Sequence, residues 1–333
     1  MSRPSAREYS KRLGELTDEQ LQAALERFDL GELLNAEPIH GGLFGQNLFL
    51  TSKMGDYVLR GSPHSAEQFP KEQFFVDLIH ERTEVPVPWP YLIDPTTDIF
   101  GWSYVVMPRL PGLQIGDPDV RERLSANDRL ALAAAMGQGL ARLHELNWAQ
   151  CGMYDFQAQT IEPIKTGFAE WFSSRTLDWL DRCKAASGAT TDADVAWVKE
   201  LLAAASDALN VSFQPAFVHQ DYKEGNTVAQ RTAGGFQVTG LFDVGGGYFG
   251  DGEEDLARSV AAYARDDVAL ARQFLQGYQS NRPLRRGFKE RFPVYMLADR
   301  LIIWEYGQRN NVWFEKGLSL QEWAGLFVSL QPF

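Results

Sequence analysis

Residues 219–226 read His219-Gln220-Asp221-Tyr222-Lys223-Glu224-Gly225-Asn226 and lie between two short apolar runs. Asp221 and Asn226 are five positions apart, so a single turn of chain can present a carboxylate and an amide oxygen to one pocket. Transfer of a phosphoryl group to a hydroxyl needs a carboxylate to orient the acceptor and take its proton. It also needs further oxygen ligands for magnesium. Alone, this pattern is short enough to occur by chance in many proteins.

A second segment, residues 240–245, strengthens this interpretation. It ends a β-like run from Gly235 to Phe242, and Asp243 is followed closely by three glycines. An Asp in that position can turn its carboxylate toward a metal shared with Asn226. The segments together predict Asp221 as the catalytic carboxylate and Asn226 and Asp243 as Mg²⁺ ligands, with the spacing of a kinase catalytic loop.

The stretch from Phe217 to Ala257 resembles the aminoglycoside phosphotransferase and choline kinase-like family, small-molecule relatives of protein kinases. In that family the first segment usually reads His-Gly-Asp, four residues, then Asn. An Asp, a Gly-Asp pair and Asp-Leu-Ala follow. This chain has the first segment at 219–226 and then Asp243, Gly250-Asp251 and Asp255-Leu256-Ala257. Gln220 replaces the usual Gly, and residues 245–247 are all glycine; both departures concern loop geometry rather than chemical groups.

The resemblance implies an α+β, bilobal protein-kinase-like fold with ATP and Mg²⁺ in the cleft. We expect residues 1–107 to form a nucleotide-binding lobe with a small antiparallel sheet. Residues 108–333 would form a larger, mainly helical lobe for catalysis and substrate binding. Glycines at 41–45 fall where family members carry a phosphate-covering loop, so Gly41, Gly42 and Gly45 are predicted to approach the nucleotide.

The expected strand from Gly55 ends in Arg60, where kinases have a lysine that holds the α- and β-phosphates. Arginine can contact phosphate, although it is no simple replacement for lysine. Glu72 is predicted to pair with Arg60, and Glu67 is the weaker candidate. The resemblance places the adenine-binding backbone near Met107 to Arg109.

The remaining segments alternate in character along the chain. We expect a helix over 5–29 with a Thr17–Gln20 capping box, short strands over 33–60 and a helix over 65–82. Further helices are expected from Ser125, over 164–184 and 192–208, and over 253–264. His144 continues an apolar stripe, which favours a buried, hydrogen-bonded histidine over a catalytic one. We expect Asp251 to hydrogen-bond the backbone of the catalytic loop.

The acceptor site is the least defined part of the sequence. In the resemblance, the C-terminal helical region helps to form it, so Trp304, Glu305 and Asp251 are candidate substrate-binding residues. Aromatic faces beside carboxylates suit an amino sugar. Packing of tryptophans in a terminal bundle explains the same pattern equally well.

Composition bounds the class of protein. The 333 residues are 44% hydrophobic and 23% charged, which is ordinary for a soluble globular chain. No apolar run approaches the roughly 18 residues of a membrane span. The polar start predicts no secretory signal, and two cysteines predict no disulfide framework, so a cytoplasmic location is expected. A net charge of −12 argues against nucleic acid and is compatible with a cationic substrate.

Three functions remain open at this point. The first is an ATP-dependent O-phosphotransferase acting on an aminoglycoside-type antibiotic or amino sugar, which implies antibiotic resistance. The second keeps this chemistry but uses a metabolite of the fructosamine, choline or homoserine type; Tyr248-Phe249-Gly250 resembles a fructosamine kinase pattern. The third is a catalytically weak nucleotide-binding regulator, which Arg60 favours and the set Asp221, Asn226 and Asp243 opposes.

Overall fold

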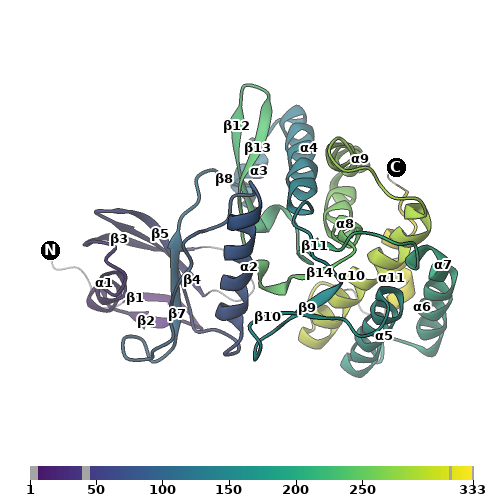
Figure 1. The fold of residues 1–333 in the computed structure, drawn as a ribbon, viewed down its shortest axis with the longest axis horizontal. Coiled ribbons are helices and arrows are strands. Elements are labelled where there is room, and N and C mark those ends of the chain that lie inside the picture. Colours follow the sequence, from purple (N-terminus) through teal and green to yellow (C-terminus); the bar gives the residue numbers. More distant parts are fainter. Residues whose placement is uncertain (1–6, 40–45, 315–316, 332–333) are drawn as a thin grey trace.

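The computed structural model describes residues 7–39, 46–314 and 317–331, and these form a small lobe and a larger helical lobe (Figure 1). The small lobe is built on an antiparallel five-stranded sheet of order β3-β4-β5-β7-β6. Its strands are β3 (Leu33–Pro38), β4 (Asn47–Ser52), β5 (Gly55–Gly61), β6 (Leu92–Asp94) and β7 (Tyr104–Pro108). The expected α+β bilobal fold is confirmed.

Alternation along the sheet strands divides the apolar side chains between two cores. On β7, Tyr104 and Val106 join a small core with α1 (Asp18–Glu26), whereas Val105 and Met107 join the large core. Successive strand residues point to opposite faces, so a period of two assigns them to different cores. Arg60 lies on β5 next to Leu59 and therefore points away from the small core and toward the site described below.

The N-terminal segment differs from the expected helix over 5–29. Residues 7–16 form a hairpin of β1 (Arg7–Ser10) and β2 (Gly14–Leu16), and only α1 is helical. The capping box of Thr17 and Gln20 is present at the start of α1, as predicted. Leu13 and Leu16 are buried in the small core, and pairing between two short strands outweighs local helix preference there.

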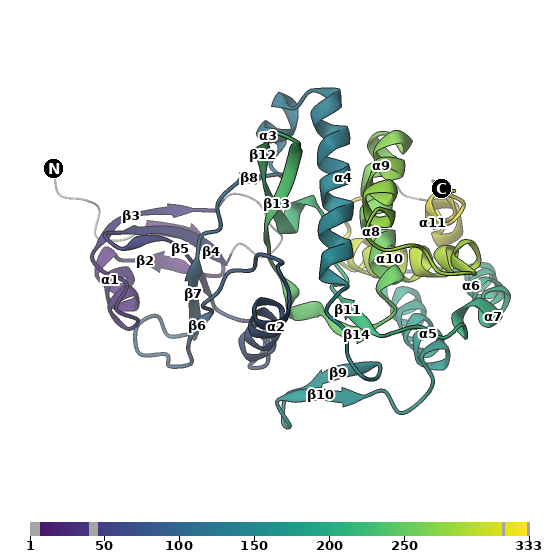
Figure 2. The same ribbon diagram turned by 45° about the horizontal axis from the view of Figure 1, so that its top comes forward.

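Helix α2 (Gln68–Arg82) joins the sheet to the large lobe and stands between them in Figure 1. The ring of Phe75 on α2 packs on the ring of Phe217 in the large lobe, with 5.0 Å between the ring centroids. The ring of Phe74 packs on Tyr154 at the same centroid separation. Tyr154 belongs to a hairpin that projects below the large lobe in Figure 2. The apolar face of α2 therefore belongs to the large core, and its position relative to that lobe is fixed by aromatic packing.

The large lobe is mainly helical, with short sheets on the side that faces α2. A four-stranded sheet of order β10-β9-β14-β11 and a three-stranded sheet of order β13-β12-β8 carry the catalytic segments. Their strands are β8 (Leu113–Gln114), β9 (Gly152–Asp155), β10 (Thr160–Pro163), β11 (Ala216–Val218), β12 (Thr227–Thr232), β13 (Gly235–Leu241) and β14 (Tyr248–Gly250).

The helices of the large lobe are α3 (Pro118–Arg123), α4 (Ala126–Leu143), α5 (Phe168–Ala186), α6 (Asp192–Ala204), α7 (Ser206–Leu209), α8 (Leu256–Asp266), α9 (Val268–Gln279), α10 (Phe288–Asn310) and α11 (Leu320–Val328). The helices predicted over 164–184, 192–208 and 253–264 are confirmed, although the last begins with a 3₁₀ turn over Gly252–Asp255. None of the helices in the described part of the chain has the length and apolarity needed to cross a membrane.

Candidate active site

Two hairpin-linked segments bring the predicted catalytic residues together. The loop 219–226 connects β11 to β12, and β12 pairs with β13, whose end leads into Asp243. The Phe242 N–H donates to the Asn226 carbonyl oxygen at 2.9 Å, and the Phe242 carbonyl lies 2.9 Å from Nε2 of His219. These two contacts hold Phe242, the residue before Asp243, against Asn226 and His219, which are the two ends of the catalytic loop (residues 219–226).

Asp221 is surrounded by donors. Its Oδ2 accepts from Lys223 Nζ at 2.6 Å and from Asn226 Nδ2 at 3.0 Å. Arg258 Nε lies 3.2 Å from Oδ1 in an ion pair. The carboxylate is about 30% exposed, so an acceptor hydroxyl can reach it.

Asn226 and Asp243 present oxygen atoms suited to a hard cation. The amide nitrogen of Asn226 is used by Asp221, and among the described residues its Oδ1 has no partner. Asp243 has a left-handed backbone with φ 58°, and its carboxylate is half-exposed. Two oxygen donors are a typical protein contribution to a magnesium site completed by phosphates and water. The described residues contain no cluster of three or more His, Cys, Asp or Glu side chains arranged to hold a metal.

Arg60 lies between two carboxylates, Glu72 on α2 and Asp243 in the large lobe. Its Nη1 donates to both oxygens of Glu72 at 2.8 and 3.0 Å, and its Nη2 donates to Asp243 Oδ1 at 3.3 Å. Burial opposes the charge of Arg60, but the neighbouring carboxylates outweigh it and the pKa of Arg60 is raised. The predicted pairing of Arg60 with Glu72 is present, and Glu67 takes no part in it.

The backbone of the catalytic loop is held by Asp255, and the expectation that Asp251 does so is wrong. Asp255 accepts from the N–H groups of His219 and Gln220 at 2.6 and 2.7 Å. His144 is fully buried, with Nε2 3.2 Å from Asp255 and Nδ1 2.9 Å from the Tyr278 hydroxyl. It is therefore a structural histidine, as predicted, and burial lowers its pKa.

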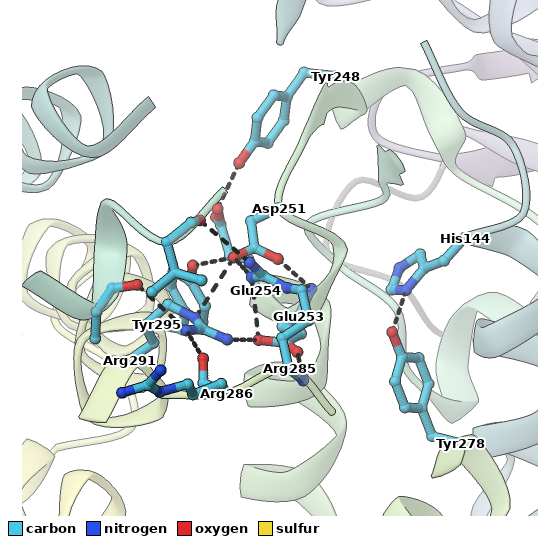
Figure 3. A network of polar contacts seen from close by, with 12 residues as sticks. His144, Tyr248, Asp251, Glu253, Glu254, Tyr278, Arg285, Arg286, Arg291 and Tyr295 are labelled. Atoms are coloured by element: carbon cyan, nitrogen blue, oxygen red, sulfur yellow. Dashed lines mark hydrogen bonds and ion pairs between the residues drawn. The ribbon is translucent and has the colours of Figure 1, made fainter. Parts of the chain in front are cut away.

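Asp251 instead belongs to a buried ionic network at the start of α8 and α10 (Figure 3). Its carboxylate accepts from Arg285 and from the Tyr295 hydroxyl, and Glu253 pairs with Arg291 in the same network. Asp251 is only 2% exposed, so its assignment to substrate binding is also wrong. The network fixes the 3₁₀ turn that carries Asp255, because buried charges need such partners.

In the backbone predicted to bind adenine, near Met107 to Arg109, one N–H group is already in use. The Arg109 N–H donates to the Asp56 carbonyl oxygen at 2.9 Å, so it is not free for adenine, and Pro108 has no N–H. The Arg109 guanidinium stacks 3.7 Å from the ring centroid of Phe49. Met107 lies in β7 opposite Val58. Gly41, Gly42 and Gly45 lie outside the described residues.

Trp304 is a core residue, and its assignment to the acceptor site is wrong. It is fully buried, donates from Nε1 to Thr190 at 2.9 Å and stacks on Trp323. Glu305 accepts from Arg309 along the same helix at 2.7 Å, and within the described part of the chain no contact joins it to Asp221. The helix α10 does reach the site, but through Asp299 rather than through these residues.

Sequence reasoning missed Lys223, Arg258 and Asp299. Lys223 lies inside the catalytic loop, and its separation of two residues from Asp221 was a usable signal. Arg258 and Asp299 are far apart in the chain and meet at 2.8 Å because α8 packs on α10. No local pattern in the sequence marks that pair.

Comparisons with known proteins identify the family to which the chain belongs. The sequence model of the phosphotransferase enzyme family (APH) matches residues 35–289. A homoserine kinase from Neisseria meningitidis is 25% identical over 300 residues, covering 87% of this chain and 88% of that protein. A homoserine kinase from Methylobacillus glycogenes is 31% identical over 132 residues, and this match covers 38% of this chain and only 37% of that protein's length.

Solved structures share the fold at low sequence identity. The aminoglycoside phosphotransferase APH(4)-Ia, in a ternary complex with ADP and hygromycin B, is 15% identical with a TM-score of 0.62, and the match covers 92% of this chain and 96% of that one. A candidate fructosamine-3-kinase from Thermobifida fusca is 18% identical with a TM-score of 0.61, covering 87% and 95%.

The family model and the homoserine kinase relatives show a phosphotransferase with a hydroxyl acceptor, and its fold is protein-kinase-like. The chain belongs to the phosphotransferase enzyme family whose model covers 35–289.

Proposed function

We propose that this protein transfers the γ-phosphoryl group of ATP to the hydroxyl of a small amino alcohol, with homoserine as the first candidate. The observation that carries the proposal is the convergence of Asp221, Asn226 and Asp243. Asn226 contacts Asp221 at 3.0 Å, and the residue before Asp243 is bonded to Asn226 at 2.9 Å. One short region thus holds a carboxylate for the acceptor and oxygen atoms for a cation.

Each residue of the site has its own role in the proposed transfer. Asp221 orients the acceptor hydroxyl and takes its proton. Arg60, held by Glu72, binds phosphate oxygens, and Asn226 Oδ1 with the Asp243 carboxylate would hold magnesium. Magnesium, when bound, neutralises the charge that develops on the phosphoryl oxygens. The complete set, with Arg60 paired to Glu72, favours an active enzyme over a nucleotide-binding regulator.

The choice of acceptor rests on two kinds of support. Homoserine kinases recur among the curated relatives, one of them along most of the chain. The aromatic residues that favoured an amino sugar or a fructosamine-type acceptor are buried in the core. Trp304 is fully buried, and Tyr248 lies in β14 with its hydroxyl bonded to Glu254. Neither side chain is available to stack on an aminoglycoside or a glycated amine.

The test is ADP release from Mg-ATP with L-homoserine, choline, a glycated lysine and hygromycin B as separate acceptors. We expect turnover with homoserine and a new phosphomonoester signal in the ³¹P spectrum. The matched control is Asp221→Asn, in which loss of the proton acceptor should lower kcat by about 10²- to 10⁴-fold. Binding of Mg-ATP should change little in that variant.

Other outcomes are decisive in the opposite direction. Turnover of hygromycin B or the glycated lysine in preference to homoserine would replace the acceptor and keep the chemistry. Full activity of Asp221→Asn would remove the role of Asp221. Tight Mg-ATP binding without transfer to any alcohol would favour the regulator.

A further inference from the structure

Arg258 is the charged side chain beside Asp221 that the proposed chemistry leaves unused. It lies in the first turn of α8, directly after the Asp255-Leu256-Ala257 segment. Its Nε is 3.2 Å from Asp221 Oδ1 and 2.8 Å from Asp299 Oδ1. The guanidinium is therefore held between the catalytic carboxylate and helix α10.

The donors of Arg258 are not used up by these two contacts. The side chain is 12% exposed, and with the described residues it makes ion pairs but no aligned hydrogen bond. Nε is sealed from solvent, whereas the two terminal nitrogens are not. Arginine carries its charge at all working pH values and offers five donors in a planar fork. The terminal nitrogens of this fork are therefore open to an acceptor that arrives with a ligand.

The neighbouring carboxylates are already matched by cations. Asp299 Oδ2 accepts from Arg300 Nε at 3.0 Å, while its Oδ1 faces Arg258. Asp221 Oδ2 accepts from Lys223. The contacts that run from Lys223 through Asp221, Arg258 and Asp299 to Arg300 join three cations to two acids. Asp255 adds a third carboxylate on the backbone of the same loop, so Arg258 itself, with its terminal nitrogens unpaired among the described residues, is the group that suits an anion on the ligand.

An anion that binds the Arg258 guanidinium comes from one of two sources, the γ-phosphate of ATP or the acceptor itself. Arg60 and the oxygens of Asn226 and Asp243 already serve the phosphates from the side of the small lobe. Arg258 contacts the other oxygen of the Asp221 carboxylate, Oδ1, whereas Asn226 contacts Oδ2, and Arg258 is held there against Asp299 of α10. Its position favours the acceptor.

We propose that Arg258 binds a carboxylate on the acceptor and so selects hydroxy amino acids over amino alcohols that lack the acid. The inference rests on the proposed phosphotransfer and names the substrate class for it. Because Arg258 and Asp221 are in contact, the carboxylate and the reacting hydroxyl must belong to one compact molecule. Homoserine satisfies this condition, whereas hygromycin B does not.

The experiment compares two matched acceptors, L-homoserine and 3-amino-1-propanol, which have the same spacing between the amine and the terminal hydroxyl and differ only in the carboxylate. Wild-type protein should prefer homoserine in kcat/KM by about 10- to 100-fold, the effect of one charge-assisted pair. Arg258→Met should remove that preference: kcat/KM should fall further for homoserine than for 3-amino-1-propanol, mainly through KM, so that the ratio between the two acceptors approaches one.

Arg258→Lys keeps the charge and the pairing with Asp299 and should restore part of the preference. It also covers the case in which Arg258→Met does not fold, and the wild-type comparison needs no variant. The KM for ATP is measured in parallel. If Arg258 contacts the γ-phosphate, loss of that contact in the variants would raise this KM with both acceptors.

Each contrary result has a distinct meaning. Equal kcat/KM for the two acceptors in wild-type protein overturns the carboxylate site and leaves the kinase intact. An equal loss with both acceptors in Arg258→Lys and Arg258→Met reduces Arg258 to a positioning residue for Asp221 or a phosphate contact. If no acceptor is turned over although Mg-ATP binds, the proposed function itself fails.

Discussion

Gln220 occupies a backbone conformation that glycine adopts more easily. Its φ is 70°, in the left-handed region, and its N–H donates to Asp255 Oδ1 at 2.7 Å. For a residue with a side chain this conformation costs about 1–2 kcal/mol. The departure from the usual His-Gly-Asp therefore keeps the geometry of the loop, and the cost falls on stability.

Gln220→Gly should raise the free energy of unfolding by about 0.5–1 kcal/mol, because the relief of strain exceeds the added chain entropy of glycine. Urea denaturation measures this change. Gln220→Ala is the matched control and should differ little from wild type, since it keeps the same strained φ. A glycine variant less stable than the alanine variant would show that the left-handed conformation carries no cost here.

His144 couples the stability of the loop to pH. Burial lowers its pKa in the folded state from the ordinary value of 6.5, with Asp255 and Arg282 acting in opposite directions. The unfolded chain binds a proton at higher pH than the folded one, so this stabilisation is complete above pH 6.5 and is lost as the pH falls below it. A tenfold weaker affinity for the proton corresponds to about 1.4 kcal/mol of stability.

Between pH 7.5 and 5.5 the wild-type free energy of unfolding should therefore fall further than that of His144→Gln. The measurement is urea denaturation at several pH values. Parallel curves for the two proteins would mean that His144 accepts a proton without disturbing Tyr278 and Asp255.

The contacts predicted correctly from sequence are local ones. Asp221 and Asn226 are separated by one turn, and Arg60 and Glu72 by 12 residues of strand and helix, so spacing alone brings them close. The error at Asp251 has a physical cause. Asp251 directly precedes the 3₁₀ turn Gly252–Asp255 that carries Asp255, and Arg285 and the buried Tyr295 decide which of the two carboxylates faces the network.

At the scale of elements, the large lobe depends on close contact between α4 and α9. A Cβ added at Gly137 of α4 would lie 2.0 Å from the Phe274 carbonyl oxygen, and one at Gly277 of α9 would lie 2.1 Å from the Ala134 carbonyl oxygen. The obstructing atoms are backbone, so they cannot turn aside as a side chain does. The two glycines let the helix backbones touch behind the catalytic loop.

Gly137→Ala and Gly277→Ala should each lower the free energy of unfolding by about 1–3 kcal/mol through overpacking, despite the better helix propensity of alanine. Gly325→Ala in α11 is the matched control, because a Cβ there meets nothing within 4 Å. That control should gain about 0.5–1 kcal/mol. Urea denaturation of the three variants gives the comparison, and equal effects at the three positions would show that α4 and α9 move apart without cost.

Helix and strand boundaries show what local patterns leave out. The capping boxes at Thr17 and Ser125 mark the starts of α1 and α4 because both hydrogen bonds lie within one helical turn. The hairpin over 7–16 was missed because its strands are stabilised by burial of Leu13 and Leu16 in the core that the distant strand β7 shares. The contact of Arg258 with Asp299 was missed for the same reason, because it depends on how α8 packs against α10.

At the scale of the whole molecule, the proposed nucleotide site is divided between the lobes. Arg60 comes from the small sheet, and Asn226 and Asp243 come from the large lobe. The Arg60–Asp243 contact of 3.3 Å is the ionic link between them at this point. A nucleotide held by both sides should therefore stabilise the two lobes as one unit.

Mg-ATP at 100 times its Kd should raise the free energy of unfolding by about 2.7 kcal/mol by mass action. Asp243→Ala removes one magnesium ligand, and if the Kd rises about 100-fold, the same concentration should give only about 0.4 kcal/mol. Thermal unfolding with and without nucleotide measures both values, and ATP with EDTA separates the metal from the nucleotide. Glu67→Ala is the matched control, because Glu67 precedes Glu72 at the start of α2 but does not contact Arg60, and it should keep the full increment. An Asp243→Ala protein stabilised as strongly as wild type, or an increment unchanged by EDTA, would exclude Asp243 as a magnesium ligand.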